Sequence, residues 1–340
     1  MTDIGLRPAQ AATQQDDARS LHRFDWVMTL LSLWFITGLF LDGWAHTHGQ
    51  VDESFFTPWH AVLYSGHMAM LLALIARWVR GRALPPGYSL SMVGAVLYLF
   101  AGVGDFLWHD AFGVEESIEA LLSPTHLVLA ASAFLIVTGV LRAAWPSASA
   151  QRTLHQQMPA LLSLTIALSV LTFFTQYASP IANVWALGNM REPFDVQEMG
   201  VVSMLLDTAL WVGAALIFMR RWQAAPGAFT LLLGLNAFAM GFLFDQGPYP
   251  LPHVLVRVVA GLVADGLMRV LHPSSQRPAA LRLFAFAVPG ALYAAYFVVA
   301  SQITGIAWSV HMWAGMVVLA GVAGLLMSFV SVPLGVIAHE

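Results

Sequence analysis

The chain has 340 residues, of which 58% are hydrophobic and only 10% are charged, and its formal net charge is −4. Soluble domains carry about a quarter of their residues as charged ones, so lipid is the expected solvent for most of this chain. All 15 basic residues are Arg and no Cys occurs, which excludes lysine Schiff bases, thiolate metal sites and disulfides. Because no basic stripe is present, we expect no nucleic-acid partner.

The hydropathy pattern predicts an all-α, polytopic integral membrane protein with about ten transmembrane helices, since a bilayer needs about 20 mostly apolar residues per span. In chain order the predicted spans are residues 24–45, 58–80, 88–109, 124–145, 158–178, 199–219, 227–245, 252–271, 281–300 and 306–329.

This pattern and the positions of the Arg residues divide the chain into three parts. Residues 1–22 are polar and lack the apolar core of a cleavable signal, so they are predicted to be a disordered cytoplasmic tail. Residues 23–146 hold four helices and residues 147–340 hold six. Cytoplasmic loops collect Arg, and nearly all Arg residues fall inside if both termini are cytoplasmic, with Arg191 in an outer loop and Arg257 within a span. We expect a bacterial inner membrane protein.

Two segments within the first four helices repeat each other. Residues 41–63 read LDGWAHTHGQVDESFFTPWHAVL, and residues 104–129 read GDFLWHDAFGVEESIEALLSPTHLVL. The matching pairs are Asp42 with Asp105, His46 with His109, Glu53 with Glu116, Thr57 with Ser123, Pro58 with Pro124 and His60 with His126. Each copy ends one predicted helix and begins the next at the outer membrane face, so the sequence predicts a duplicated helical hairpin.

The spacing within each copy predicts a cluster of one carboxylate and two imidazoles. Residues four apart share a helix face, so Asp42 projects together with His46. Thr57 and Pro58 suit the N-cap and first position of a helix that then holds His60 in its first turn. Two His and one carboxylate are a recurrent ligand set for copper, iron or zinc. Contact with interfacial water is the alternative, but duplication favours metal ligands at Asp42, His46, His60, Asp105, His109 and His126.

Other polar residues near the hairpins admit several roles. His67 lies seven residues after His60 on the same helix face, about 10 Å deeper in the membrane, and fits a further ligand, a proton relay or a packed core histidine. Glu53 and Glu116 are either partners that orient the imidazoles or solvated loop acids. His48 has no counterpart in the second copy and is predicted to be a solvated loop residue.

The segment LDGWAHTHGQVDESFFTPWH resembles the DxxxH…FTPxH segment of the C subunit of particulate methane monooxygenase and its ammonia monooxygenase relatives. In that family the segment supplies an Asp and two His to an intramembrane copper site. The resemblance therefore implies that Asp42, His46 and His60 are copper ligands.

The second hairpin resembles a later segment of the same subunit, in which an Asn and two His bind a neighbouring copper. Asp105, His109 and His126 take those places, and Asp105 departs from the family pattern by adding a negative charge. The resemblance covers roughly residues 38–140. The family's enzyme is a multi-subunit assembly with a soluble copper-binding subunit that has no counterpart in this sequence. The resemblance therefore supports metal binding by this chain more strongly than it supports oxidation of methane or ammonia.

The second half of the chain has a separate set of polar residues. Asp245 ends the seventh predicted helix, and His253 begins the eighth after the sequence GPYPLP. Arg257 shares a helix face with His253, Asp265 lies eight residues further on, and Asp207 in the sixth helix is a candidate partner for Arg257. An unpaired charge within a membrane is costly, so we expect an ion-paired structural contact here rather than a third functional site.

Two functions from different classes follow from these observations. The first is a copper-dependent membrane oxidoreductase, resembling a monooxygenase, in which a metal held by only three residues binds oxygen and oxidises a small apolar substrate arriving through lipid. The second is a protein that transports or binds metal ions or protons without oxidation chemistry. Copper is the expected cofactor, and iron or zinc fits the same donors. The lipid bilayer is the expected partner, with further membrane or periplasmic subunits and a homo-oligomer left open.

Overall fold

The computed structural model describes residues 6–50, 56–81, 83–113, 118–151, 153–186, 194–245, 250–303 and 305–332, and for residues 6–18 and 194–195 it describes the backbone alone. Within these ranges the ordered elements are helices and no β-strand occurs. The prediction of an all-α chain is confirmed for the residues described.

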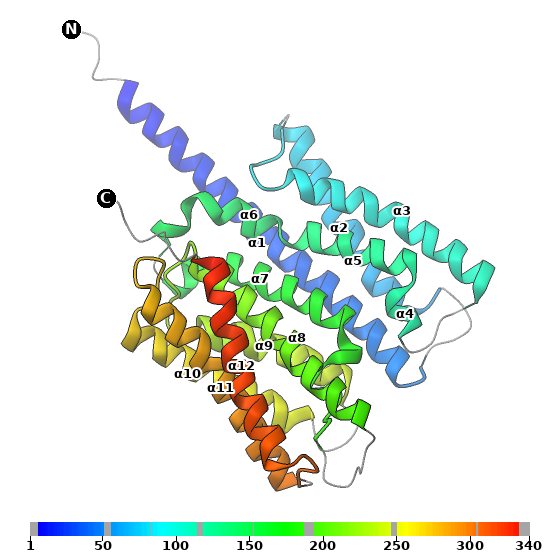
Figure 1. Ribbon diagram of the computed structural model, residues 1–340. Helices are drawn as coiled ribbons and strands as arrows, with labels where there is room; N and C mark the ends of the chain where they lie inside the picture. Colours follow the sequence, from blue (N-terminus) through cyan, green and yellow to red (C-terminus); the bar gives the residue numbers. More distant parts are fainter. Residues whose placement is uncertain are drawn as a thin grey trace.

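The α-helices follow one another with short connections (Figure 1). Their bounds are α1 (Leu6–Thr47), α2 (Pro58–Gly81), α3 (Ser89–Phe112), α4 (Glu119–Leu122), α5 (Pro124–Val137), α6 (Gly139–Ala144), α7 (Leu154–Phe174), α8 (Phe194–Met219), α9 (Ala228–Leu243), α10 (Pro250–Leu271), α11 (Pro278–Ile303) and α12 (Val310–Ser331). Two short 3₁₀ helices accompany them, η1 (Trp145–Ala150) and η2 (Gln176–Ala178).

Each predicted span coincides with a helix, and 8 helical segments of the described chain are long and apolar enough to cross a membrane. They lie in α1, α2, α3, the continuous unit formed by α5, α6 and η1, and in α7, α8, α11 and α12. The other two predicted spans correspond to α9, which has 16 residues, and to α10, which carries three charged residues. The fold is that of a multi-pass helical membrane protein.

The N-terminal prediction needs a correction. Helix α1 begins at Leu6, so residues 6–22, which were predicted to be disordered, continue the first membrane helix. The sequence AQAATQQDDARS is polar but rich in Ala and Gln, which are good helix formers. Hydropathy detects the apolar part of this helix and misses its polar extension.

Helix α1 lies between two groups of helices (Figure 1). It packs against α2 on one side and against α7 and α9 on the other, while α3 packs against α5. Two glycines permit the close contact of α1 with α2, because a Cβ at Gly38 would lie 2.5 Å from Leu63 Cα and one at Gly66 would lie 2.8 Å from Phe35 Cα. This packing sets the two hairpins, α1 with α2 and α3 with α5, side by side.

Candidate metal centres

Helix caps fix the depth of the histidines that begin α2 and α5. The His60 backbone N–H donates to Thr57 Oγ1 at 3.1 Å, and the His126 backbone N–H donates to Ser123 Oγ at 3.4 Å. Such bonds satisfy helix N–H groups that have no partner within the helix. The predicted caps are confirmed, and each cap holds its histidine in the first turn.

The triad of the second hairpin brings three potential ligand atoms together. Asp105 Oδ1 lies 3.3 Å from His126 Nε2, and Asp105 Oδ2 lies 3.6 Å from His109 Nε2. All three ligand atoms lie within 4.8 Å of one another, and within the described ranges this is the one group of His, Cys, Asp or Glu of this kind. Asp105 is only 2% exposed, so water solvates its charge poorly.

These separations are long for direct hydrogen bonds and also fit a shared cation. An N–H···O hydrogen bond usually spans about 2.7–3.2 Å, which is shorter than both carboxylate–imidazole contacts of Asp105. Tetrahedral coordination with bonds of about 2.0–2.1 Å sets ligand atoms about 3.3 Å apart. Asp105, His109 and His126 therefore each offer one ligand atom to a cation that could lie between them.

Neighbouring groups fix the orientation of the second triad. Ser123 Oγ lies 2.7 Å from His126 Nδ1, and the Gly113 carbonyl lies 3.4 Å from His109 Nδ1. The Thr125 hydroxyl donates to Asp105 Oδ1 at 2.8 Å. Because each imidazole has a partner at Nδ1, its Nε2 is the atom that faces the carboxylate.

The triad of the first hairpin is more open. Asp42 Oδ1 lies 3.3 Å from His60 Nε2, whereas Asp42 Oδ2 lies 3.9 Å from His46 Nε2. The His46 side chain is 34% exposed, compared with 12% for its counterpart His109. The structure therefore assembles both predicted triads, and the second is the more compact and more buried.

A tyrosine that the sequence analysis did not single out lies between the two hairpins. Tyr64 follows His60 by one helical turn, and their rings meet edge to face at 5.9 Å. On the other side, a Cβ at Gly102 of α3 would lie 2.9 Å from Cε1 of the Tyr64 ring. Gly102 precedes Asp105 by three residues, so Tyr64 touches the helix of each triad about one turn below it. The i, i+4 spacing from His60 was the available sequence signal.

His67 belongs to the packed core rather than to the first triad. It is 1% exposed, its Nε2 hydrogen-bonds the Ala95 carbonyl at 2.8 Å, and its ring packs on Tyr98. Of its three predicted roles, the structure favours a core histidine. Glu53 and Glu116, predicted as orienting partners or loop acids, lie outside the described residues.

His48 is not the solvated residue that was predicted. Its Nε2 lies 2.6 Å from Asp245 Oδ1, its Nδ1 lies 2.8 Å from the Trp44 carbonyl, and its side chain is 15% exposed. The contact links the turn after α1 to the end of α9. Spacing within one hairpin could not reveal a partner 197 positions away.

The predicted pairing of Asp207 with Arg257 is confirmed. Arg257 Nη2 donates to Asp207 Oδ2 at 2.8 Å, and the Tyr293 hydroxyl donates to the same oxygen at 2.7 Å. Arg257 is 4% exposed and Asp207 is 8% exposed. Here a guanidinium neutralises the buried carboxylate, which is the arrangement expected for a structural contact.

The other polar residues of the second half make separate contacts. Asp265 accepts hydrogen bonds from the backbone N–H groups of Phe229 and Thr230 at 3.1 and 3.0 Å and from the Thr230 hydroxyl at 2.6 Å. It therefore caps the N-terminus of α9. His253 stacks on Tyr296 with ring centroids 4.5 Å apart. The sequence analysis considered five polar residues of the second half together. In the structure they make four separate local contacts: Asp207 with Arg257, Asp245 with His48, His253 with Tyr296, and Asp265 with the start of α9.

Comparison with known proteins gives no further assignment. No family model matches the chain, and neither a curated protein nor a solved structure matches it. The function must be argued from the two triads themselves.

Proposed function

We propose that this chain is a membrane metal-binding protein in which each hairpin holds one metal ion. The observation that carries the proposal is the convergence of Asp105, His109 and His126, whose ligand atoms lie within 4.8 Å of one another. Asp42, His46 and His60 form the second, more open site in this proposal. Copper is the proposed metal, with iron or zinc as the other metals that this donor set accepts.

The negative charges of Asp42 and Asp105 support this proposal independently of the distances between the ligand atoms. Burying a carboxylate without a compensating cation is expensive. Among the described residues no Arg contacts Asp42 or Asp105, whereas Asp207 has Arg257. In this proposal a divalent cation at each triad supplies the positive charge that Arg257 supplies at Asp207.

Oxidation of a small apolar substrate is the proposed activity, and one further observation favours it. On α3 the side chains of Val103, Leu107 and Phe112, which flank Asp105 and His109, are 56%, 58% and 73% exposed. In a membrane this face meets lipid, so an apolar molecule can reach the second triad from the hydrocarbon. Copper held there would supply redox chemistry with dioxygen, while the chain's own residues orient the ligands and leave coordination positions open.

Metal content tests the binding proposal. The full-length protein is purified in detergent, loaded separately with copper, iron and zinc, desalted and analysed by mass spectrometry of the elements. We expect about two equivalents of the preferred metal. Alanine replacement of Asp105, His109 and His126 together should remove one equivalent, and replacement of Asp42, His46 and His60 should remove the other.

The matched control is His311→Ala, which removes an exposed imidazole from the start of α12. It should leave the metal content unchanged. Equal metal content in the wild type and both triple variants would overturn the proposal. Oxygen-dependent turnover of small hydrocarbons by the loaded protein tests oxidation separately, and metal uptake into vesicles without such turnover would support transport instead.

A further inference from the structure

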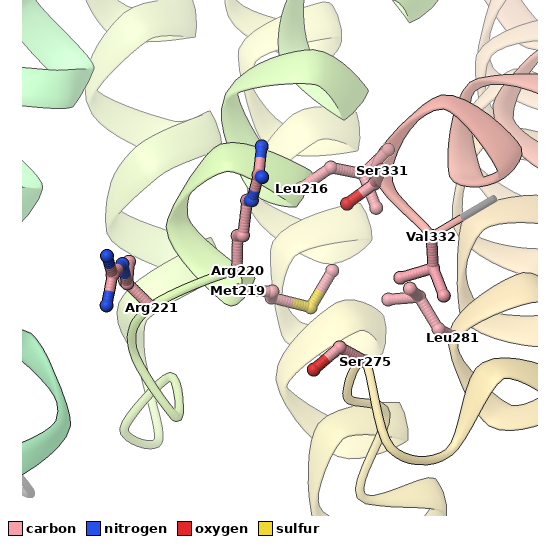
Figure 2. Close-up of a pocket in the computed structure, with 8 residues that line it drawn as sticks. All are labelled: Leu216, Met219, Arg220, Arg221, Ser275, Leu281, Ser331 and Val332. Atoms are coloured by element: carbon pink, nitrogen blue, oxygen red, sulfur yellow. The ribbon is translucent and has the colours of Figure 1, made fainter. Parts of the chain in front are cut away.

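A cavity lies at the opposite end of the bundle from the two triads. It has a volume of about 470 Å³ and is formed where α8 ends, where α11 begins and where α12 ends. Eight residues line it: Leu216, Met219, Arg220, Arg221, Ser275, Leu281, Ser331 and Val332 (Figure 2). Volumes of about 300–1,000 Å³ are typical of small-molecule sites.

The lining combines positive charge, hydroxyl groups and apolar surface. Arg220 and Arg221 supply two guanidinium groups, Ser275 and Ser331 supply two hydroxyl donors, and none of the described lining residues is acidic. Figure 2 shows the two serines on the side of the cavity across from α8. Such donors suit a group with several negatively charged oxygen atoms, such as a phosphate.

The two arginines have no competing carboxylate among the residues that the structure describes. Neither guanidinium contacts an acidic side chain within the described part of the chain. Arg221 lies over the ring of Trp145, 5.4 Å from its centroid, and in Figure 2 its side chain points away from the two serines. Within the residues that the structure describes, the positive charge at the cavity therefore has no acidic partner.

The surroundings favour a lipid over a free anion. The four other lining residues, Leu216, Met219, Leu281 and Val332, are apolar. Beside the cavity, Ile217 on α8 is 47% exposed and Val330 on α12 is 84% exposed. Acyl chains can pack on these side chains while the phosphate lies at the arginines. Basic pockets between membrane helices are typical sites for anionic lipid headgroups.

We propose that this cavity binds the phosphate-bearing headgroup of an anionic membrane phospholipid. The ligand contributes its phosphate to the two guanidinium groups and the serine hydroxyls, and its acyl chains extend along α8 and α12. The proposal does not depend on metal binding, because the cavity and the triads lie at opposite ends of the helices.

Lipid titration of the full-length protein in detergent tests the proposal. Native mass spectrometry measures the binding of phosphatidylglycerol, phosphatidylcholine and inorganic phosphate. We expect phosphatidylglycerol to bind more tightly than the zwitterionic lipid. The variant Arg220→Gln/Arg221→Gln should bind it roughly 30-fold more weakly, since each basic residue near anionic lipid contributes about a factor of five.

The matched control is Arg80→Gln, which removes an exposed guanidinium from the last turn of α2. It should bind phosphatidylglycerol like the wild type, and Arg220→Lys/Arg221→Lys should retain most of the affinity. Equal binding of the two lipids, or an equal loss in Arg80→Gln, would overturn the proposal. Full competition by inorganic phosphate at millimolar concentration would assign the cavity to a free anion and overturn the lipid assignment.

Discussion

In α3 and α5 the carboxylate of Asp105 faces two imidazoles, whereas in α8 and α10 the carboxylate of Asp207 faces a guanidinium and a phenol. Both carboxylates are buried in a membrane protein. At Asp207 the protein provides the compensating charge at 2.8 Å. At Asp105 the described partners are the Thr125 hydroxyl at 2.8 Å and two imidazoles at 3.3 and 3.6 Å, and no arginine is among them. The two carboxylates thus differ in their source of compensating charge, and our proposal assigns that role at Asp105 to a metal cation.

A third carboxylate completes this comparison. Asp265 has neither an arginine nor a histidine, but backbone N–H groups at the start of α9 and the Thr230 hydroxyl satisfy it. The partial positive charge at a helix N-terminus stabilises a carboxylate. Among these acids, Asp105 is the one whose described neighbours, His109 and His126, offer ligand atoms within 4.8 Å of its own, and we propose a second, more open site at Asp42.

The largest effect is expected from removal of the buried guanidinium. Arg257→Met leaves Asp207 charged and without its cation, which should lower the free energy of unfolding by about 3–5 kcal/mol. Unfolding in mixed micelles with increasing dodecyl sulfate measures this change. The double variant Asp207→Asn/Arg257→Met should recover most of the loss. Wild-type stability of the single variant would show that the ion pair does not hold α8 to α10.

The next largest effect concerns metal affinity. Asp105→Asn keeps the shape of the side chain but removes its charge, so the metal affinity of the second site should fall at least about 100-fold. Competition with a chromophoric chelator measures the affinity. The matched change Asp265→Asn should leave metal affinity unaltered and lower stability instead. Equal metal affinities in these two variants would contradict the distinction between the carboxylates.

The smallest effect comes from a pair of threonines that donate to these two acids. Thr125→Val removes the 2.8 Å bond to Asp105, and metal affinity should fall by about 10–100-fold because the ligand loses its orienting partner. Thr230→Val removes the 2.6 Å bond to Asp265 and should cost about 1 kcal/mol of stability. Chelator competition and unfolding are measured on both proteins. Loss of metal affinity in Thr230→Val would count against the account.

Local sequence patterns predicted much of this fold and of the candidate site. Hydropathy located the helices, and the i, i+4 spacing together with the Thr-Pro and Ser-Pro caps correctly grouped each Asp with its two His. Contacts between distant segments could not be predicted in the same way. The pairing of His48 with Asp245 and the position of Tyr64 against Gly102 depend on how the helices pack, which no periodicity within one segment encodes.

X-ray absorption of the copper-loaded protein tests the central claim most directly. The account predicts nitrogen and oxygen ligands at about 2.0 Å, with the outer-shell scattering of about two imidazoles per copper. In the His109→Ala/His126→Ala variant the copper content should be halved, while the copper that remains should keep about two imidazoles per ion. Copper surrounded by oxygen ligands without imidazole scattering, or a copper content that this variant leaves unchanged, would contradict metal binding by the two triads.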